Sequence, residues 1–408
     1  MPDSHENFMS TSAPSSSSLS RPYFRSLDGL RLLASLNIVL FHFERAGGFT
    51  NLHGHAWFLR IVKGPMFHAT MFFILGGFIF YFIYEQKLDR FSTRRFLLTR
   101  IKTLYPLHVL TTLAMVPFAI MKVQQWSPGA VGRIAGETGI HLGLLFSLAP
   151  VGEFTYNTPS WALSAFFFCY LLFGPALRLI LRIDKPAFAF ALAVACMVPP
   201  LVWTWVYGLT GWERRWYLFF HIAAPIRFFE FLMGMAVARL FRLAGTAQRP
   251  WHRLLCTPWG GSGAVVVAMT LLYLSLGLRR GEAPAMAWIS YHVLVMPLFA
   301  LLVYACACEC GPIAAVFRIK VIRQLGKSSF YPYLLHIPVV SWVSHILARY
   351  FDNRTFLHEP LNVAVLTASL YVVGAIYGER FSPHRGLRHI GKVSAGALRE
   401  QGGGGGSG

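Results

Sequence analysis

Long apolar runs recur along the whole chain, and they restrict its fold more than any other feature of the sequence. Each run is close to the ~20 residues that a helix needs to cross the hydrocarbon core of a bilayer. Only 13% of the 408 residues are charged, about half the share found in soluble domains, and 55% are hydrophobic. The sequence therefore predicts an all-α, polytopic membrane protein.

The length of the apolar runs predicts about ten transmembrane helices. We place them at residues 27–44, 66–84, 104–121, 160–180, 186–207, 217–238, 259–278, 286–308, 330–348 and 361–379. A further run at 139–150 is too short to cross comfortably, and we expect it to be re-entrant or interfacial. With ten spans and both termini cytoplasmic, 25 of the 37 Lys and Arg residues lie in inner segments and 11 in outer loops. The positive-inside rule favours this topology.

The chain divides into one membrane domain and two tails. We expect a disordered Ser-rich tail at 1–25, a transmembrane domain at 26–382, and a basic cytoplasmic tail at 383–408 that ends in a Gly/Ser linker typical of cloning. The formal net charge of +20 comes mainly from short loops, where cations meet anionic membrane lipid, so nucleic acid is not an expected partner. The six cysteines lie in or beside apolar runs, which predicts neither a disulfide framework nor a metal site.

The first span combines an arginine and a histidine on one hydrophobic helix. Arg31 and His42 are eleven residues apart, which places them on the same helical face and about 16 Å apart along the axis. One explanation is that Arg31 reaches a lipid headgroup while His42 bonds to a neighbouring helix. The other is a ligand that is anionic at one end and reactive at the other, lying along this face.

Two later spans also contain polar side chains, which are costly inside a bilayer. Arg227 and Glu230 lie three residues apart, and we expect them to form a structural ion pair. Polar residues also recur along the span at 330–348, where prolines predict a kinked helix; they are Ser329, Tyr333 and His336.

The strongest basic cluster follows the second predicted span. It lies in the sequence QKLDRFSTRRFLLTRIKTLYPLH and includes Arg95, Arg100 and Lys102. Cations at this position beside a membrane are suited to lipid phosphates or to a phosphorylated cofactor.

Six sequence blocks together resemble the integral-membrane acyltransferase-3 family. The Arg31–x10–His42 spacing is similar to the family's Arg/Lys–x10–His signature. The other blocks occur in the family's order over about 90% of the chain: MFFILGGFIFYF, RRFLLTRIKTLYPLH, NTPSWALSAFFFCYLLFGP, RFFEFLMGM and LGKSSFYPYLLHIP.

The resemblance implies a ten-helix domain that moves an acyl group, usually acetyl, from cytoplasmic acyl-CoA to an acceptor outside. The hydrolase-like domain of many family members is not found in this sequence, which is similar to stand-alone acetyltransferases of xanthan-type exopolysaccharide mannose. We therefore expect acetyl-CoA as co-substrate, a free or lipid-linked glycan as acceptor, no metal, and a location in the bacterial inner membrane.

Each candidate residue then has an expected role. His42 is the expected general base for the acceptor hydroxyl, with an acyl-histidine intermediate as the alternative route. The anionic head of acyl-CoA is expected to bind a set of cations: Arg31, Arg95, Arg100 and Lys102. A second set is expected to line the tunnel or stabilise an oxyanion: Trp161, Ser164, Ser329, Tyr333 and His336.

Two positions depart from the family pattern. Phe166 stands where the family has Glu, and Thr103 replaces the second arginine of the family's Arg-x-x-Arg. Tyr156 and Asn157 are further candidates for contact with a sugar.

A proton-coupled transporter with buried His, Glu and Arg is the main alternative, although the inverted repeats typical of transporters are not found. A lipid-binding scaffold is the third interpretation.

Overall fold

The computed structural model describes residues 23–49, 52, 55–62, 66–123, 127–148, 156–210, 221–275, 293–353 and 355–381. Regular secondary structure in these ranges is entirely helical, as the sequence predicted, and they contain no strand. The two tails lie outside the described residues except for residues 23–25, so the prediction about them stays a prediction.

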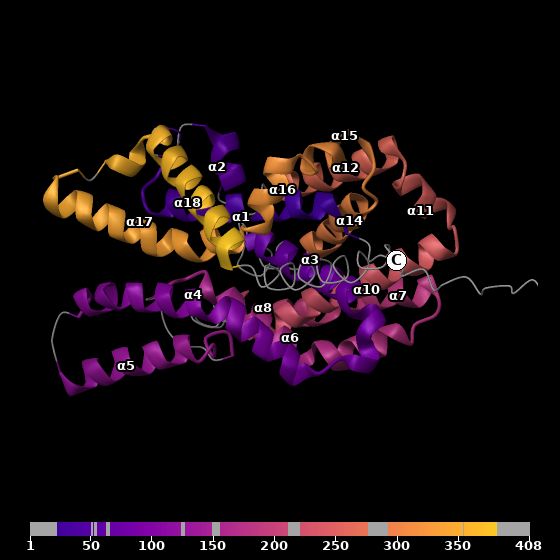
Figure 1. Cartoon of the computed structure of the whole chain (residues 1–408), viewed down its shortest axis with the longest axis horizontal. Helices are drawn as coiled ribbons and strands as arrows, with labels where there is room; N and C mark the ends of the chain where they lie inside the picture. Colours follow the sequence, from indigo (N-terminus) through magenta and orange to yellow (C-terminus); the bar gives the residue numbers. More distant parts are fainter. Residues whose placement is uncertain are drawn as a thin grey trace, which may run out of the picture.

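Most of the described residues belong to helices that are labelled in Figure 1. The longer ones are α1 (Arg25–Arg45), α3 (Met66–Tyr84), α4 (Thr93–Met121), α5 (Pro128–Leu142), α6 (Ser160–Leu181), α7 (Pro186–Ala195), α8 (Val198–Thr210), α10 (Ala224–Thr246), α12 (Pro258–Ser275), α14 (Val295–Ala307), α17 (Phe330–Tyr350) and α18 (Pro360–Phe381). The shorter ones are α2 (Ala56–Val62), α11 (Pro250–Leu255), α15 (Gly311–Phe317), α16 (Lys320–Lys327) and the 3₁₀ helices η2 (Glu85–Arg90) and η5 (Phe356–His358).

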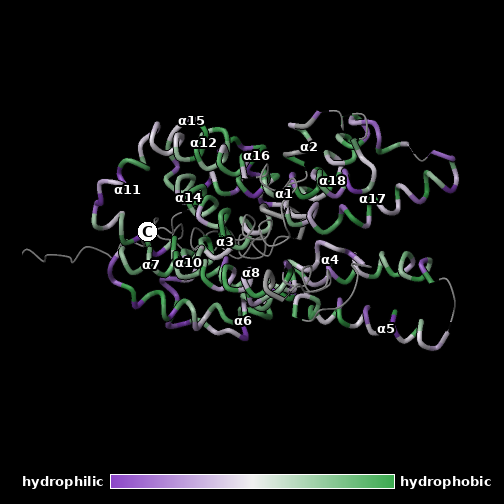
Figure 2. The backbone as a smooth tube through the Cα atoms, turned by 180° about the vertical axis from the view of Figure 1, so that it is seen from behind, coloured by the Kyte–Doolittle hydropathy of each residue, from purple (hydrophilic) through white to green (hydrophobic). Residues whose placement is uncertain are grey.

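Seven of these helices are long and apolar enough to cross a membrane, and α14 with α15 makes an eighth if this pair, bent by 86°, is one span. The two remaining predicted spans, 217–238 and 330–348, correspond to α10 and α17, which contain the buried residues Arg227, Glu230 and His336. Figure 2 shows hydrophobic residues along much of α3, α10 and α14 and hydrophilic residues on α11. The structure supports a polytopic membrane protein, while the count of ten and the cytoplasmic termini stay predictions.

The helices pack around α1, α3 and α10. Helix α10 packs on α3, α6 and α7, and α1 packs on α3, α16 and α17. In Figure 1, α7 and α11 lie at one end of the long axis, and α17 reaches the other end together with α4 and α5. Segments far apart in the sequence therefore meet at the middle of the molecule, where α1 passes between these groups.

Helices α3 and α10 cross in direct backbone contact at two glycines. A Cβ atom on Gly77 would lie 1.9 Å from the carbonyl oxygen of Phe231, and one on Gly234 would lie 1.9 Å from that of Ile74. Small residues at a crossing let helices approach closely in a membrane, where packing rather than water exclusion drives their association. The two glycines set the spacing of the central pair of helices.

The short apolar run at 139–150 lies before α6. Its first residues form the end of α5 and residues 143–148 form turns, and its re-entrant or interfacial position stays a prediction. Ser127 caps the start of α5 by accepting a hydrogen bond from the amide of Ala130, and Pro128 occupies the first turn. The hydroxyl of Tyr105 on α4 donates to the carbonyl of Leu142, so α5 lies along α4.

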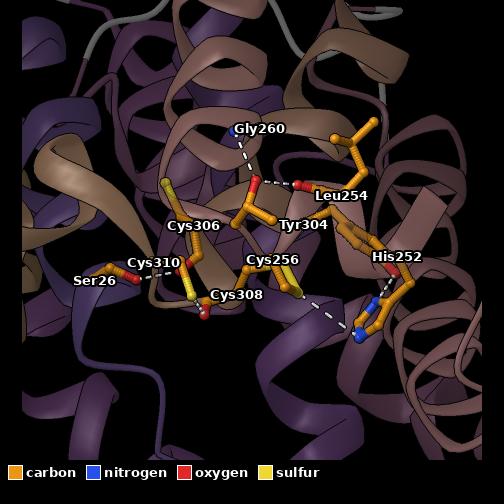
Figure 3. Close-up of a disulfide and its surroundings, with 10 residues drawn as sticks. Ser26, His252, Leu254, Cys256, Gly260, Tyr304, Cys306, Cys308 and Cys310 are labelled. Atoms are coloured by element: carbon orange, nitrogen blue, oxygen red, sulfur yellow. Dashed lines mark hydrogen bonds between the residues drawn. A yellow bond between two sulfur atoms is a disulfide. The ribbon is translucent and has the colours of Figure 1, made fainter. Parts of the chain in front are cut away.

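Two of the six cysteines are bonded to each other, a pairing that the sequence analysis did not predict. Cys256, just before α12, is bonded to Cys308, just after α14, with 4.9 Å between their Cα atoms (Figure 3). The sequence separation of 52 residues gives no sign of this contact. The pair meets because α12 and α14 pack against each other.

The glycine contact between α3 and α10 predicts a specific loss of stability. Gly234→Ala should lower the Tm of the purified protein, because overpacking costs about 1–3 kcal/mol. Gly263→Ala on α12 is the matched control, since a Cβ atom there meets nothing within 4 Å. The thermal unfolding of the two variants is monitored by size-exclusion chromatography. Equal Tm values would contradict the proposed contact.

Candidate functional site

Two histidines from distant parts of the chain face each other. His42 lies in the last turn of α1 and His336 in the second turn of α17, and their ring centroids are 5.0 Å apart with an interplanar angle of 42°. His336 is fully buried, whereas His42 keeps part of its surface accessible. The structure therefore brings together two candidate residues that the sequence separates by almost 300 positions.

The hydrogen bond of His336 fixes its tautomer. Its Nδ1 atom lies 3.1 Å from the carbonyl oxygen of Pro332. A carbonyl only accepts, so Nδ1 carries the proton and Nε2 is left with its lone pair. Nε2 is buried and has no hydrogen-bond partner among the described residues. This imidazole can thus accept a proton or a hydrogen bond from a bound molecule.

A proline and an asparagine shape α17 next to His336. Pro338 has no N–H group, so the carbonyl of Leu334 loses its usual partner four residues later in the helix. The side chain of Asn157 donates to this carbonyl from its Nδ2 atom at 2.9 Å. Asn157 is completely buried, and its Oδ1 atom has no partner within the described ranges. The segment before α6 therefore supplies the donor that the proline removes from α17.

Further hydrogen bonds join the start of α17 to α1 and α6, and α1 to α18. The hydroxyl of Ser35 on α1 donates to the carbonyl of Ser329 at 3.2 Å and lies 2.5 Å from the hydroxyl of Tyr371 on α18. Tyr333 donates to the carbonyl of Pro159 at 2.8 Å. The hydroxyl of Tyr333 is thus engaged within the protein, whereas Ser329 contributes only its backbone carbonyl to these bonds.

Arg31 lies at the opposite end of α1 from His42. Its guanidinium Nη1 is 3.1 Å from Oδ1 of Asp28, and about a third of its side chain is exposed. The hydroxyl of Tyr23 donates to the other oxygen of Asp28. Partial burial and this carboxylate raise the pKa of Tyr23 to about 12, so the phenol stays protonated. Asp28 thus holds Arg31 in place, while the remaining guanidinium N–H groups can bind an anion.

Two cations that were not predicted share the neighbour Tyr23 with Arg31. Arg323 and Lys327 come from α16; Arg323 is near enough to Tyr23 to act on it electrostatically, and the Lys327 ammonium lies 5.0 Å from its ring centroid. The Nε atom of Arg323 is buried without a partner in the described part of the chain. These two residues could not be predicted from the sequence, because α16 precedes the ninth predicted span and is far in sequence from the first span.

Of the predicted cations on α4, Arg100 shares the neighbour Tyr170 with Arg31. Arg100 stacks over Phe80 at 4.8 Å, and both arginines lie near enough to Tyr170 to act on it electrostatically. Arg95 and Lys102 are exposed. The basic segment, expected to be a loop, is the first part of α4. Arg95 and Lys102 are five and two residues away from Arg100, and on a helix these separations place their side chains on a different face from Arg100.

Comparisons with known proteins show the family to which the chain belongs. The model of an acyltransferase domain, acyltransferase family 3, matches residues 24–378. The chain belongs to this acyltransferase family. Acyltransferase MdmB of Streptomyces mycarofaciens is 27% identical over 326 residues, which cover 78% of this chain and 79% of MdmB. No solved structure gives a significant match. The protein is therefore a membrane acyltransferase with a polytopic helical fold.

The predicted ion pair forms the centre of a buried network in this acyltransferase. Arg227 is completely buried, and its Nη1 atom lies 2.6 Å from Oε1 of Glu230. The same nitrogen donates to Thr70 on α3 at 3.1 Å, and the guanidinium lies 5.1 Å from the ring centroid of Trp161 on α6. The network joins three helices and gives Trp161 a packing role.

The remaining predicted residues in α6 and in the segment before it contact other residues of the protein. Ser164 accepts from the amide of Ser147 and donates to the carbonyl of Leu144, so its hydroxyl is engaged within the protein. Phe166, at the place of the family's Glu, stacks on Phe73 with 4.3 Å between ring centroids. Tyr156 lies 2.8 Å from the hydroxyl of Thr138. An apolar stack therefore occupies the position where the family has a carboxylate.

The contact between Asn157 and α17 predicts non-additive effects on stability. Asn157→Ala should destabilise the protein by about 1–3 kcal/mol, because it leaves the carbonyl of Leu334 buried without a donor. Pro338→Ala supplies a backbone N–H that can bond to this carbonyl. In the Pro338→Ala background the loss caused by Asn157→Ala should therefore be smaller, as measured by Tm in a double-mutant cycle. Strictly additive losses would contradict this interpretation.

Proposed function

We propose that this acyltransferase moves an acetyl group from acetyl-CoA at the cytoplasmic face of a bacterial inner membrane to a sugar hydroxyl outside. The observation that carries the proposal is the layout of α1. Arg31 and its neighbouring cations lie at one end, and the His42–His336 pair lies about 16 Å further along the helix. The phosphates of coenzyme A suit the first site, and its extended pantetheine arm suits the distance to the second.

The proposed reaction is a direct acyl transfer. His42 takes the proton of the acceptor hydroxyl as the oxygen attacks the thioester carbonyl carbon. The tetrahedral intermediate then breaks its carbon–sulfur bond, and the coenzyme A thiolate leaves and takes up a proton. The products are an O-acetyl ester and free coenzyme A. His336 assists, and the two ring centroids are 5.0 Å apart. The lone pair on its Nε2 can orient His42 or receive its proton.

The proposed acceptor is a glycan, either an exopolysaccharide mannose of the xanthan type or a lipid-linked oligosaccharide. Membership of the acyltransferase family supports acyl transfer, and MdmB is named as an acyltransferase. The same membership argues against the transporter alternative, because transport alone requires no acyl donor. Mass spectrometry of a panel of glycans incubated with the protein and acetyl-CoA would identify the acceptor.

The role of the histidine pair predicts a large loss of activity. His42→Ala should reduce acetyl transfer by about 10²–10⁴-fold, the usual contribution of a general base. His345→Ala on α17 is the control, because that histidine packs on Phe118 rather than in the pair. Thiol release from acetyl-CoA and product mass spectrometry provide the two readouts. Near-normal turnover of a folded His42→Ala protein would remove this residue from the mechanism.

The cation cluster predicts an effect on the donor alone. Arg31→Ala should raise the KM for acetyl-CoA by about tenfold, because a hydrogen bond to a charged group is lost, and it should leave the KM for the acceptor unchanged. Arg178→Ala, an exposed position in the last turn of α6, serves as the control. A titration in which Arg31→Ala binds acetyl-CoA as tightly as the unchanged protein would contradict this placement.

A further inference from the structure

A second cavity lies away from the histidine pair and is lined by apolar side chains. Its volume is about 690 Å³, within the usual range for small-molecule sites. Helix α10 contributes Met233, Val237 and Leu240, and α7 and α14 provide residues on either side, including Ala193 and Ala300. We call this cavity the α7–α14 groove. None of its lining residues belongs to α1 or α17, so it is separate from the proposed reaction site.

One end of the groove is chemically different from the rest. Arg249, Pro250 and Trp251 line it at the start of α11, and Tyr304 lines it from α14. Among the described residues that line the groove, Arg249 alone has a charged side chain. No carboxylate in the described ranges lies within ion-pair distance of its exposed guanidinium. The groove thus ends in a cation that has no counter-charge among the described residues.

Contacts behind this end hold its walls together. Nδ1 of His252 lies 2.5 Å from the hydroxyl of Tyr304, and the disulfide between Cys256 and Cys308 joins the same two regions (Figure 3). Burial lowers the pKa of His252, which favours the neutral imidazole and leaves Arg249 as the local positive charge. The mouth of the groove is therefore built by fixed contacts between α11 and α14.

The outer rim of the groove faces the lipid region. Phe190 and Val194 line the groove and are 59% and 47% exposed, as expected for side chains that contact acyl chains in a membrane-spanning helix. Trp251 is 40% exposed and lies beside Arg249, a combination typical of the boundary between hydrocarbon and headgroups. In the predicted topology this boundary is the cytoplasmic one.

From these observations we infer that the α7–α14 groove binds one anionic phospholipid of the inner leaflet. An acyl chain fills the apolar part between α7 and α14, and the phosphate of the headgroup pairs with Arg249. Charge favours this occupant over a zwitterionic lipid, because the phosphate of an anionic lipid has no neighbouring ammonium to compete with the guanidinium.

Native mass spectrometry of the full chain, purified and supplied with equal amounts of phosphatidylglycerol and phosphatidylcholine, tests the inference. The unchanged protein should retain one phosphatidylglycerol in preference to phosphatidylcholine. Arg249→Gln should reduce that preference by about tenfold, as expected for the loss of a charge-assisted hydrogen bond. Arg253→Gln, four residues later on α11, is the matched control and should keep the preference, since Arg253 lies outside the groove lining.

A second pair of variants tests the apolar part. Ala300→Trp should fill the groove and remove the retained lipid, whereas Val266→Trp, on an exposed face of α12, should not. The inference is overturned if Ala300→Trp keeps the lipid, or if Arg253→Gln loses the preference as Arg249→Gln does. Excess acetyl-CoA should leave the lipid bound. Its displacement by acetyl-CoA would assign the groove to the acyl donor and also overturn the inference.

Discussion

The backbone contact between α3 and α10 fixes the centre of the molecule. Gly77 and Gly234 each leave room for a carbonyl of the opposite helix, and no side chain at either place would allow the same spacing. Because the two helices are this close, Arg227 reaches from α10 to Thr70 on α3 while it pairs with Glu230. Removing one partner of a fully buried pair typically costs about 3–5 kcal/mol, so the network also fixes the register of the crossing.

Helix α17 contains an internal proline, and the carbonyl that this proline leaves without a backbone donor still has a hydrogen-bond partner. Pro338 removes a donor, Asn157 supplies one from another segment, and the turn that results contains His336. The bond from His336 to Pro332 then leaves Nε2 as an acceptor. A buried imidazole of fixed tautomer therefore lies next to His42, and its Nε2 lone pair is suited to acid–base chemistry.

The proposed donor site and the α7–α14 groove use different parts of one scaffold. The donor site follows α1 from Arg31 to His42, whereas the groove lies on the outer side of α10 and α14 and ends at Arg249. Ser26 links the two regions, because its hydroxyl donates to the carbonyl of Cys306 at 2.5 Å. Cys306 is part of α14, so a lipid held in the groove would support the helix against which the start of α1 packs.

The sequence by itself determined the helical membrane fold, the family and the pairing of Arg227 with Glu230, since apolar length and helical periodicity are local properties. It also placed His42 and Arg31 on one face of one helix. Only the tertiary structure decided that His336 faces His42, that Arg323 joins Arg31, and that Arg95 points away from it. These outcomes depend on how helices distant in the sequence pack, and no local pattern encodes the partner across a helix interface. The same reason explains why the bond between Cys256 and Cys308 was missed.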